Sequence, residues 1–214
     1  MSAATTSRAR WIILPTVRGR EAWRTAIVAG ARAEGLRLVD WDSARQADAA
    51  NDPAAIILTK DADAARAAGA AAERTTVLLG TGAPDLDAIP AGADRNALLL
   101  HTTQFMARAE AFPASRAVCA QDLDGAPVEL APGLGVVPPE DQVPSDLSRN
   151  LELYGRSDAA VIWGPSFFTY DARNADQGPK TGEMDLTGRP RFLIHGPYIV
   201  MPPGRWKAVF RLGF

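Results

Sequence analysis

Residues 54–80 read AAIILTKDADAARAAGAAAERTTVLLG, and this stretch decides the fold class. It holds two apolar runs, 54–59 and 75–80, on either side of a segment, 61–73, whose inner side is almost wholly Ala. Near-continuous runs of Ile, Leu and Val are typical of strands buried on both faces, and a helix between two such strands is the crossover of a parallel sheet. The stretch therefore predicts a β-α-β unit in which small Ala side chains let the helix pack closely on the sheet.

The same alternation extends over residues 11–112. We predict three further strands, at 11–17, 36–41 and 97–101, and two further helices, at 21–34 and 102–111. In the helix at 21–34, Trp23, Ile27 and Gly30 or Ala31 share one face. Right-handed crossovers then favour an open, three-layer α/β sheet of about five strands within a domain at residues 1–113. Its order is predicted as flavodoxin-like, 2-1-3-4-5, with a Rossmann-type half as the alternative, because strand order is not a local property.

Beyond Pro113 the pattern changes. Residues 122–148 are rich in Pro, which excludes long regular elements, so we interpret 114–150 as a connector that runs along a surface. Residues 151–214 follow as a small antiparallel β module, with short strands predicted at 159–163, 167–170, 192–195, 198–201 and 205–212. Such short strands form a marginal core, and either the first domain or another chain must cover the module.

The module closes on a predicted β-hairpin. Pro203-Gly204 suits a type II turn, because Pro sets the second position and Gly accepts the positive φ of the third. The alternation that follows places Trp206 and Phe210 on one face of a half-buried strand, where we expect them to be core residues. No Asp or Glu follows Asp185, so this end of the chain is locally basic.

Composition limits the classes of partner. The chain carries a formal net charge of −2 with a pI near 5.7, which gives no general attraction to nucleic acid or anionic lipid. The apolar run 11–14 is too short for a signal-peptide core or a membrane span, so neither a secretion signal nor membrane insertion is expected. We expect a cytoplasmic location, or the surface of a particle assembled in the cytoplasm. Cys119, among small apolar residues, is interpreted as a buried structural thiol without a cationic neighbour.

The ends of the predicted parallel strands are the first candidate site, because ligands of open α/β sheets bind beyond the carboxyl ends of the strands. After the first strand come Thr16, Arg18, Gly19 and Arg20, where helix amides and two arginines could meet a phosphate. Neither a GxGxxG nor a GxxxxGK[ST] motif is present, and a turn role for Gly19 and an N-cap role for Asp61 are the simpler interpretations.

Metal and acid–base chemistry have little support in the sequence. His101 is predicted at the end of the fifth strand, and a structural role is favoured because no nucleophile or orienting acid is placed beside it. No His-x-x-x-His or Cys-x-x-Cys pair is present, so no metal site and no cofactor are expected.

The β module offers a second candidate site, for a carbohydrate. Sugar rings present an apolar face that packs on aromatic side chains, while their hydroxyls bind polar groups nearby. An acidic polysaccharide would suit the basic end of the chain. The candidate carbohydrate-binding residues are Trp163, Tyr170, Arg191, His195, Tyr198 and Arg205.

The run IHGPYI at 194–199, followed by PPGRW at 202–206, resembles the opening of carbohydrate-binding-like β-sandwich modules of bacterial surface-polysaccharide proteins. The resemblance covers about 25 residues and implies a jelly roll that recognises surface or capsular polysaccharide. Similar modules look like those on adhesive spikes of phage-like particles, which implies an oligomeric spike component. The resemblance implies several further strands after Phe210, whereas the sequence given runs to Phe214.

Three hypotheses follow. The first is a non-catalytic protein of carbohydrate recognition or adhesion, in which the α/β domain is a scaffold. The second is a glycosyltransferase-related enzyme that binds a nucleotide-sugar at the α/β strand ends. The third is a structural protein, a homo-oligomer or part of a larger assembly, that pairs its C-terminal strand with another chain. The missing acid, base and nucleophile constellation favours the first.

Overall fold

The structure is a computed structural model that describes residues 7–15, 19–44, 47–79, 93–139, 153–156, 158–164, 168–170 and 194–210. Its centre is a five-stranded parallel sheet, which confirms the predicted α/β class. The strands are β1 (Arg10–Ile13), β2 (Arg37–Asp40), β3 (Ala55–Thr59), β4 (Thr75–Leu79) and β5 (Arg116–Cys119). Their order is β2-β3-β1-β4-β5, so the flavodoxin-like order 2-1-3-4-5 is wrong, and β3 rather than β2 neighbours β1.

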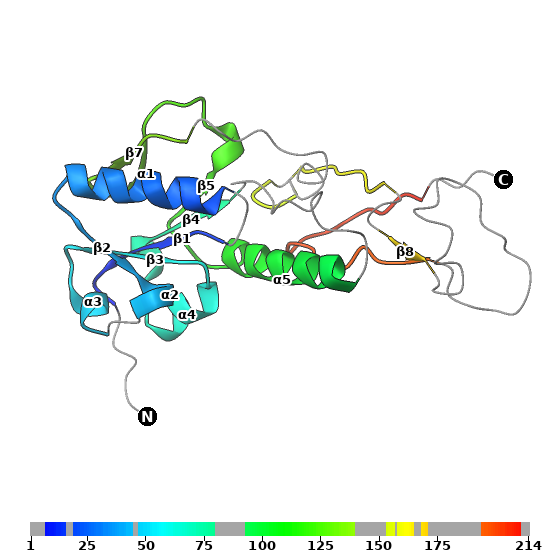
Figure 1. The fold of residues 1–214 in the computed structure, drawn as a ribbon, viewed down its shortest axis with the longest axis horizontal. Helices are drawn as coiled ribbons and strands as arrows, with labels where there is room; N and C mark the ends of the chain where they lie inside the picture. Colours follow the sequence, from blue (N-terminus) through cyan, green and yellow to red (C-terminus); the bar gives the residue numbers. More distant parts are fainter. Residues whose placement is uncertain are drawn as a thin grey trace, which may run out of the picture.

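Five α-helices and two short 3₁₀ turns connect the strands in the described residues. The helices are α1 (Arg20–Ala33), α2 (Trp41–Ala44), α3 (Ala47–Asn51), α4 (Ala62–Ala67) and α5 (Ala93–Glu110), and the 3₁₀ turns are η1 (Ala72–Arg74) and η3 (Ala120–Asp122). Helix α1 lies on one face of the sheet, and α2, α3 and α4 lie on the other (Figure 1). From β1 the chain moves to β2 at one edge of the sheet. From β2 it moves back in the opposite direction, through β3 and β4 to β5 at the other edge. Crossovers of one hand therefore place α1 alone on its face.

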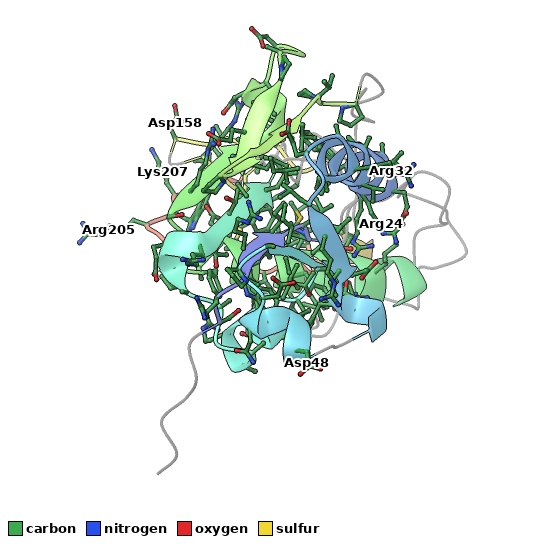
Figure 2. The ribbon with its side chains drawn as sticks, turned by 90° about the vertical axis from the view of Figure 1, so that its left-hand side faces the viewer. Arg24, Arg32, Asp48, Asp158, Arg205 and Lys207 are labelled. Atoms are coloured by element: carbon green, nitrogen blue, oxygen red, sulfur yellow. The ribbon has the colours of Figure 1, made fainter. Side chains whose placement is uncertain are left out.

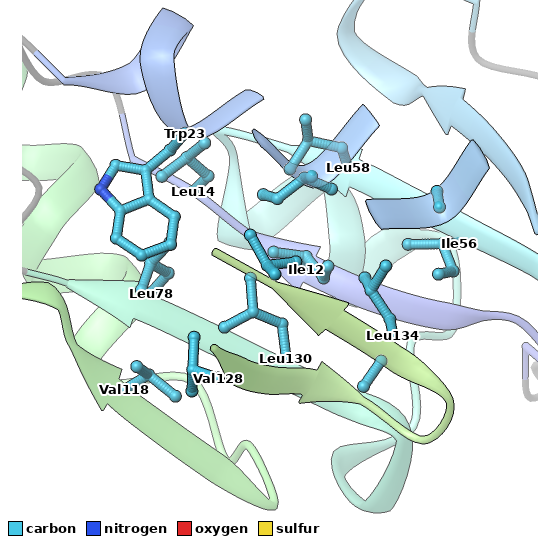
Figure 3. Packing of buried hydrophobic residues seen from close by; sticks show 14 of the residues in the cluster. Ile12, Leu14, Trp23, Ile56, Leu58, Leu78, Val118, Val128, Leu130 and Leu134 are labelled. Atoms are coloured by element: carbon cyan, nitrogen blue, oxygen red, sulfur yellow. The ribbon is translucent and has the colours of Figure 1, made fainter. Parts of the chain in front are cut away.

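An antiparallel hairpin covers the rest of the face that α1 leaves open. It consists of β6 (Val128–Ala131) and β7 (Leu134–Val136), joined through Pro132-Gly133, with Gly133 at φ +76°. Its apolar side chains join those of β1, β3, β4 and α1 in one buried cluster (Figure 3). The prediction of a surface connector over 122–148 missed this hairpin, because the Pro content was given more weight than the alternation on either side of Pro-Gly.

The helix α1 and this hairpin approach each other closely. The predicted inner face of α1 is confirmed, since Trp23, Ile27 and Ala31 are buried. A Cβ added to Gly30 would lie 2.4 Å from the carbonyl oxygen of Gly135 in β7, so only Gly fits at this point of the helix. The helix at 21–34 was thus predicted correctly, and Gly30 has a packing role on the side of the hairpin.

The fifth strand lies elsewhere than predicted. Residues 97–101 belong to α5, and the strand beside β4 is β5. A short apolar run such as ALLLH cannot be assigned to a buried strand or a buried helix by periodicity alone. The correction moves His101 from a strand end to an exposed position on α5.

The described part of the C-terminal region contains one short strand pair. Strand β8 (Thr169–Tyr170) pairs antiparallel with β9 (Ile194–His195), inside two of the predicted strands. Residues 159–163, 198–201 and 205–210 form no strand, so the predicted hairpin around Pro203-Gly204 is wrong. Trp206 is 41% exposed and Phe210 78% exposed, which contradicts the expectation that they are core residues. No described helix has the length and apolar character needed to cross a bilayer.

Candidate functional site

The carboxyl ends of β1, β2 and β3 carry a network of charged and polar groups centred on Asp42. Its carboxylate accepts hydrogen bonds from Arg20 Nη2 at 2.9 Å, from Thr59 Oγ1 at 2.8 Å and from the backbone N–H of Lys60 at 3.1 Å. Arg20 and Asp42 are both largely buried, with 15% and 19% of their side chains exposed. Their ion pair holds the start of α1 against the end of β2.

The neighbouring predicted residues at this edge have structural roles where they are described. Gly19 is the N-cap residue of α1 at φ −78°, a conformation open to any residue. Asp61 caps α4, and its side chain accepts hydrogen bonds from Asp63 N and Ala64 N, as the N-cap interpretation predicted. Thr16 and Arg18 lie outside the described residues.

His101 and Phe105 lie on one side of α5, one turn apart. Their rings meet edge to face with centroids 4.8 Å apart, and Lys60 Nζ is 5.9 Å from the Phe105 ring. These contacts link α5 to the end of β3. They form a cation–π and aromatic contact rather than an acid–base pair.

Cys119, at the end of β5, is half-buried and has a cationic neighbour. The guanidinium of Arg156 contacts the Cys119 thiol and lies 2.5 Å from Asp122 Oδ1. Both contacts raise the pKa of Arg156 above its ordinary value, and the contact with Cys119 has the larger effect. The expectation that Cys119 has no cationic neighbour is therefore wrong, because the neighbour comes from a distant part of the sequence.

The C-terminal region packs on helix α5 through an apolar surface. Met106 and Ala107 are buried with Leu153 and Tyr154, and Leu99 is buried under a second group of side chains. The partly buried residues that complete these two groups are Leu98, Ala159, Val161, Trp163, Phe168, Ile199, Val200 and Met201. Segments near 153–163 and 199–201 thus pack along both halves of α5 (Figure 1).

A pair of hydrogen bonds fixes the backbone of Val200 to this surface. Its N–H donates to Thr103 Oγ1 at 3.0 Å, and its carbonyl accepts from the hydroxyl of Tyr154. Thr103 in turn donates to the carbonyl of Leu99 at 2.8 Å. Burial raises the pKa of Tyr154, and the hydrogen bond with Thr103 offsets part of this rise. Tyr154 therefore remains a neutral donor. We call this arrangement the Val200 clamp.

Beyond the clamp the chain turns outward and exposes its side chains. All residues from 203 to 210 are exposed, including Arg205, Trp206, Lys207 and Phe210. Trp206 donates its indole N–H to the carbonyl of Pro202 at 2.9 Å, which holds the ring over the turn. We call residues 203–210 the outer segment. Figure 2 shows Arg205 and Lys207 projecting from the same side of the molecule.

The other predicted carbohydrate-binding residues fall in different places. Tyr198, 38% exposed, lies just before the clamp, whereas Trp163 is only partly exposed because it packs beside Leu99. Tyr170 and His195 belong to β8 and β9, but their side chains lie outside the described part of the structure, as does Arg191. Sequence reasoning did not single out Phe210 or Lys207 as contact residues, since it assigned Phe210 to a core.

The chain was compared with models of protein families, with curated proteins and with solved structures, and none of them matches. The function must therefore be argued from the geometry of the described residues.

Proposed function

We propose that this chain is a non-catalytic recognition protein with a rigid α/β scaffold and an exposed contact segment. The ligand that we propose is a carbohydrate, in the form of a surface or capsular polysaccharide. One observation carries the proposal: Tyr198, Trp206 and Phe210 expose their rings from one short stretch of chain, next to the anchor at Val200.

The anchoring matters for affinity. Ordering a loop on binding costs free energy, and a contact ring that is already held in place avoids part of that cost. The indole of Trp206 is held by its hydrogen bond to Pro202, and this bond also satisfies the only donor of the ring. What remains exposed is the apolar surface of the indole, which suits the apolar face of a sugar ring.

The strand-end network supports the competing nucleotide-sugar hypothesis less well. Arg20, one of the two arginines that this hypothesis assigns to a phosphate, is already paired with Asp42, and releasing it would leave a largely buried carboxylate without its partner. The polar groups at this edge therefore serve the fold in the described residues.

A glycan array that contains neutral and acidic polysaccharides tests the proposal. Trp206→Ala should weaken binding by about thirtyfold, because truncation of an aromatic hot spot costs about 2 kcal/mol. Its melting temperature should stay close to that of the wild type, since the ring is substantially exposed. Val137→Ala, at another exposed apolar side chain, is the control and should bind normally. Absence of binding to every glycan would sink the proposal.

Strand pairing with another chain is a second candidate function, favoured by a separate observation. Residues 205–210 run without helix or turn, and no hydrogen bond of their backbone is found among the described residues. Such an unpaired stretch can template pairing with another strand. Static light scattering tests this: the wild type should self-associate, and Ala208→Pro, which removes a backbone donor, should not. A monodisperse wild-type monomer at high concentration would contradict self-pairing.

A further inference from the structure

We infer that the polysaccharide bound by the outer segment is anionic, with Arg205 and Lys207 contacting its acidic groups and Trp206 contacting a sugar ring. This inference rests on the proposed function and names the class of glycan.

The local charge of the outer segment favours an anionic ligand. Arg205 and Lys207 are exposed, and residues 194–210 contain no Asp or Glu, although the whole protein has more acidic than basic residues. Elsewhere many arginines are neutralised: Arg20, Arg24, Arg66 and Arg108 each pair with an aspartate. Within the described residues neither Arg205 nor Lys207 forms such a pair. Among the described residues, the outer segment thus presents two cations outside any ion pair on a protein that is slightly acidic overall.

The geometry of the outer segment brings its two cations to one side. Arg205 and Lys207 are two positions apart on an extended stretch of chain, so their side chains lie on the same side and their Cα atoms are about 6.5 Å apart. Figure 2 shows them projecting together into solvent, on the side where Asp158 also projects. Trp206 lies between them in sequence and is fixed by its bond to Pro202. Because side chains alternate along such a stretch, the Trp206 ring faces the side opposite the two cations. A polymer that crosses over the exposed segment, rather than one that lies along a single side of it, would meet the ring and both cations.

The backbone of the outer segment offers further polar groups. Among the described residues the N–H and C=O groups of 205–210 have no backbone partner, and exposed groups of this kind can bind hydroxyl groups. A polyanion without hydroxyls or sugar rings would use the two cations alone. An anionic polysaccharide uses the cations, the ring and the backbone, and this combination is the one that the outer segment offers.

The experiment measures retardation of the full chain in native gels that contain alginate, a polyuronate, or dextran, a neutral glucan, at increasing NaCl. Wild type should be retarded strongly by alginate, and the effect should weaken as salt rises above about 0.1 M, where the Debye length falls below about 10 Å. Arg205→Gln with Lys207→Gln should bind alginate about tenfold more weakly, roughly threefold for each exposed charge. The matched control is Arg8→Gln with Arg32→Gln, which removes the same charge at exposed positions outside the outer segment.

The outcomes distinguish the anionic assignment from the proposal of carbohydrate recognition. Equal, salt-insensitive retardation by alginate and dextran, or equal loss in the double variant and its control, would overturn the anionic assignment and leave carbohydrate recognition standing. No retardation by either polymer, together with a blank glycan array, would overturn both. Inorganic polyphosphate, which has neither sugar rings nor hydroxyl-bearing carbons, is the second polyanion: Trp206→Ala should weaken alginate binding more than polyphosphate binding, and equal weakening of the two would also overturn the assignment.

Discussion

Replacing Thr103 by Val should release the Val200 clamp and leave the parallel sheet intact. Thr103 lies buried on α5, where its hydroxyl accepts the N–H of Val200 at 3.0 Å and donates to the carbonyl of Leu99 at 2.8 Å. Val has nearly the same shape as Thr, so the substitution removes both hydrogen bonds without opening a cavity. The carbonyl of Leu99 keeps its place in the helix, but the N–H of Val200 loses its partner.

The magnitude follows from the cost of leaving a donor without a partner. An unsatisfied buried group costs about 1–3 kcal/mol, and because Val200 is only partly buried we expect about 1.5 kcal/mol. The second attachment, from the Tyr154 hydroxyl to the Val200 carbonyl, remains in this variant. The Val200 clamp should therefore open about ten times more often, but it should not be lost.

Amide hydrogen exchange followed by NMR measures this opening directly. In Thr103→Val the amide of Val200 should exchange about ten times faster than in the wild type. The amide of Ile57, in the centre of the sheet, should be unchanged, which shows that the effect is local. Thr103→Ser keeps the hydroxyl and should restore slow exchange. Unchanged protection of Val200 in Thr103→Val would refute the clamp.

Three further predictions concern the scaffold. Gly30→Ala should destabilise the protein to urea by about 1–3 kcal/mol, despite the higher helix propensity of Ala, because its Cβ would meet Gly135 O; Gly135→Ala has open space and serves as the control. Burial raises the pKa of Glu110, so stability should fall as pH rises from 4.5 through the raised value, and Glu110→Gln should flatten this dependence in thermal melts. Asp61→Ala should cost about 1 kcal/mol in urea unfolding by removing the cap of α4, and Asp61→Asn should cost much less.

The sheet could be predicted from the sequence wherever a strand is a continuous apolar run. Strands β3 and β4 are buried at every position, and the runs at 54–59 and 75–80 contain them. Strand β5 has two exposed positions out of four, and the apolar residues around it are mostly small, so it lacks the run of Ile, Leu and Val that marks β3 and β4. The apolar run 97–101 falsely indicated a strand, because a helix buried along part of its length also contains consecutive Leu residues.

The two Pro-Gly pairs make the role of tertiary context clear. At Pro132-Gly133 the flanking strands pair, because α1 and the sheet cover Val128, Leu130 and Leu134. At Pro203-Gly204 the same turn chemistry is followed by alternating residues, yet residues 205–210 are exposed and form no strand with any described residue. Local sequence thus specifies where a hairpin can form, and the layer above the strands decides whether it does.

The anchoring of the proposed site had no local signal at all. Tyr154 and Val200 are 46 residues apart, and Thr103 and Val200 are 97 apart. Neither hydrogen bond follows from spacing or from a motif. The pairing of Arg156 with Cys119 is of the same kind. What the sequence did indicate was Tyr198, one of the candidate carbohydrate-binding residues, which is 38% exposed.

The length of α5 explains why recognition would lie on the outer segment rather than at the strand ends. Helix α5 has 18 residues and is about 27 Å long, whereas β4 has five residues and is about 17 Å long. Its N-terminal half therefore extends past the carboxyl edge of the sheet, with Leu98 and Leu99 in need of cover (Figure 1). The segments around Trp163 and Ile199 provide that cover, beside the edge where open α/β sheets usually bind ligands. Among the described residues, the protein's own chain covers this part of α5, and the aromatic and basic side chains beyond Pro202 are those that we propose for contact with a polymer.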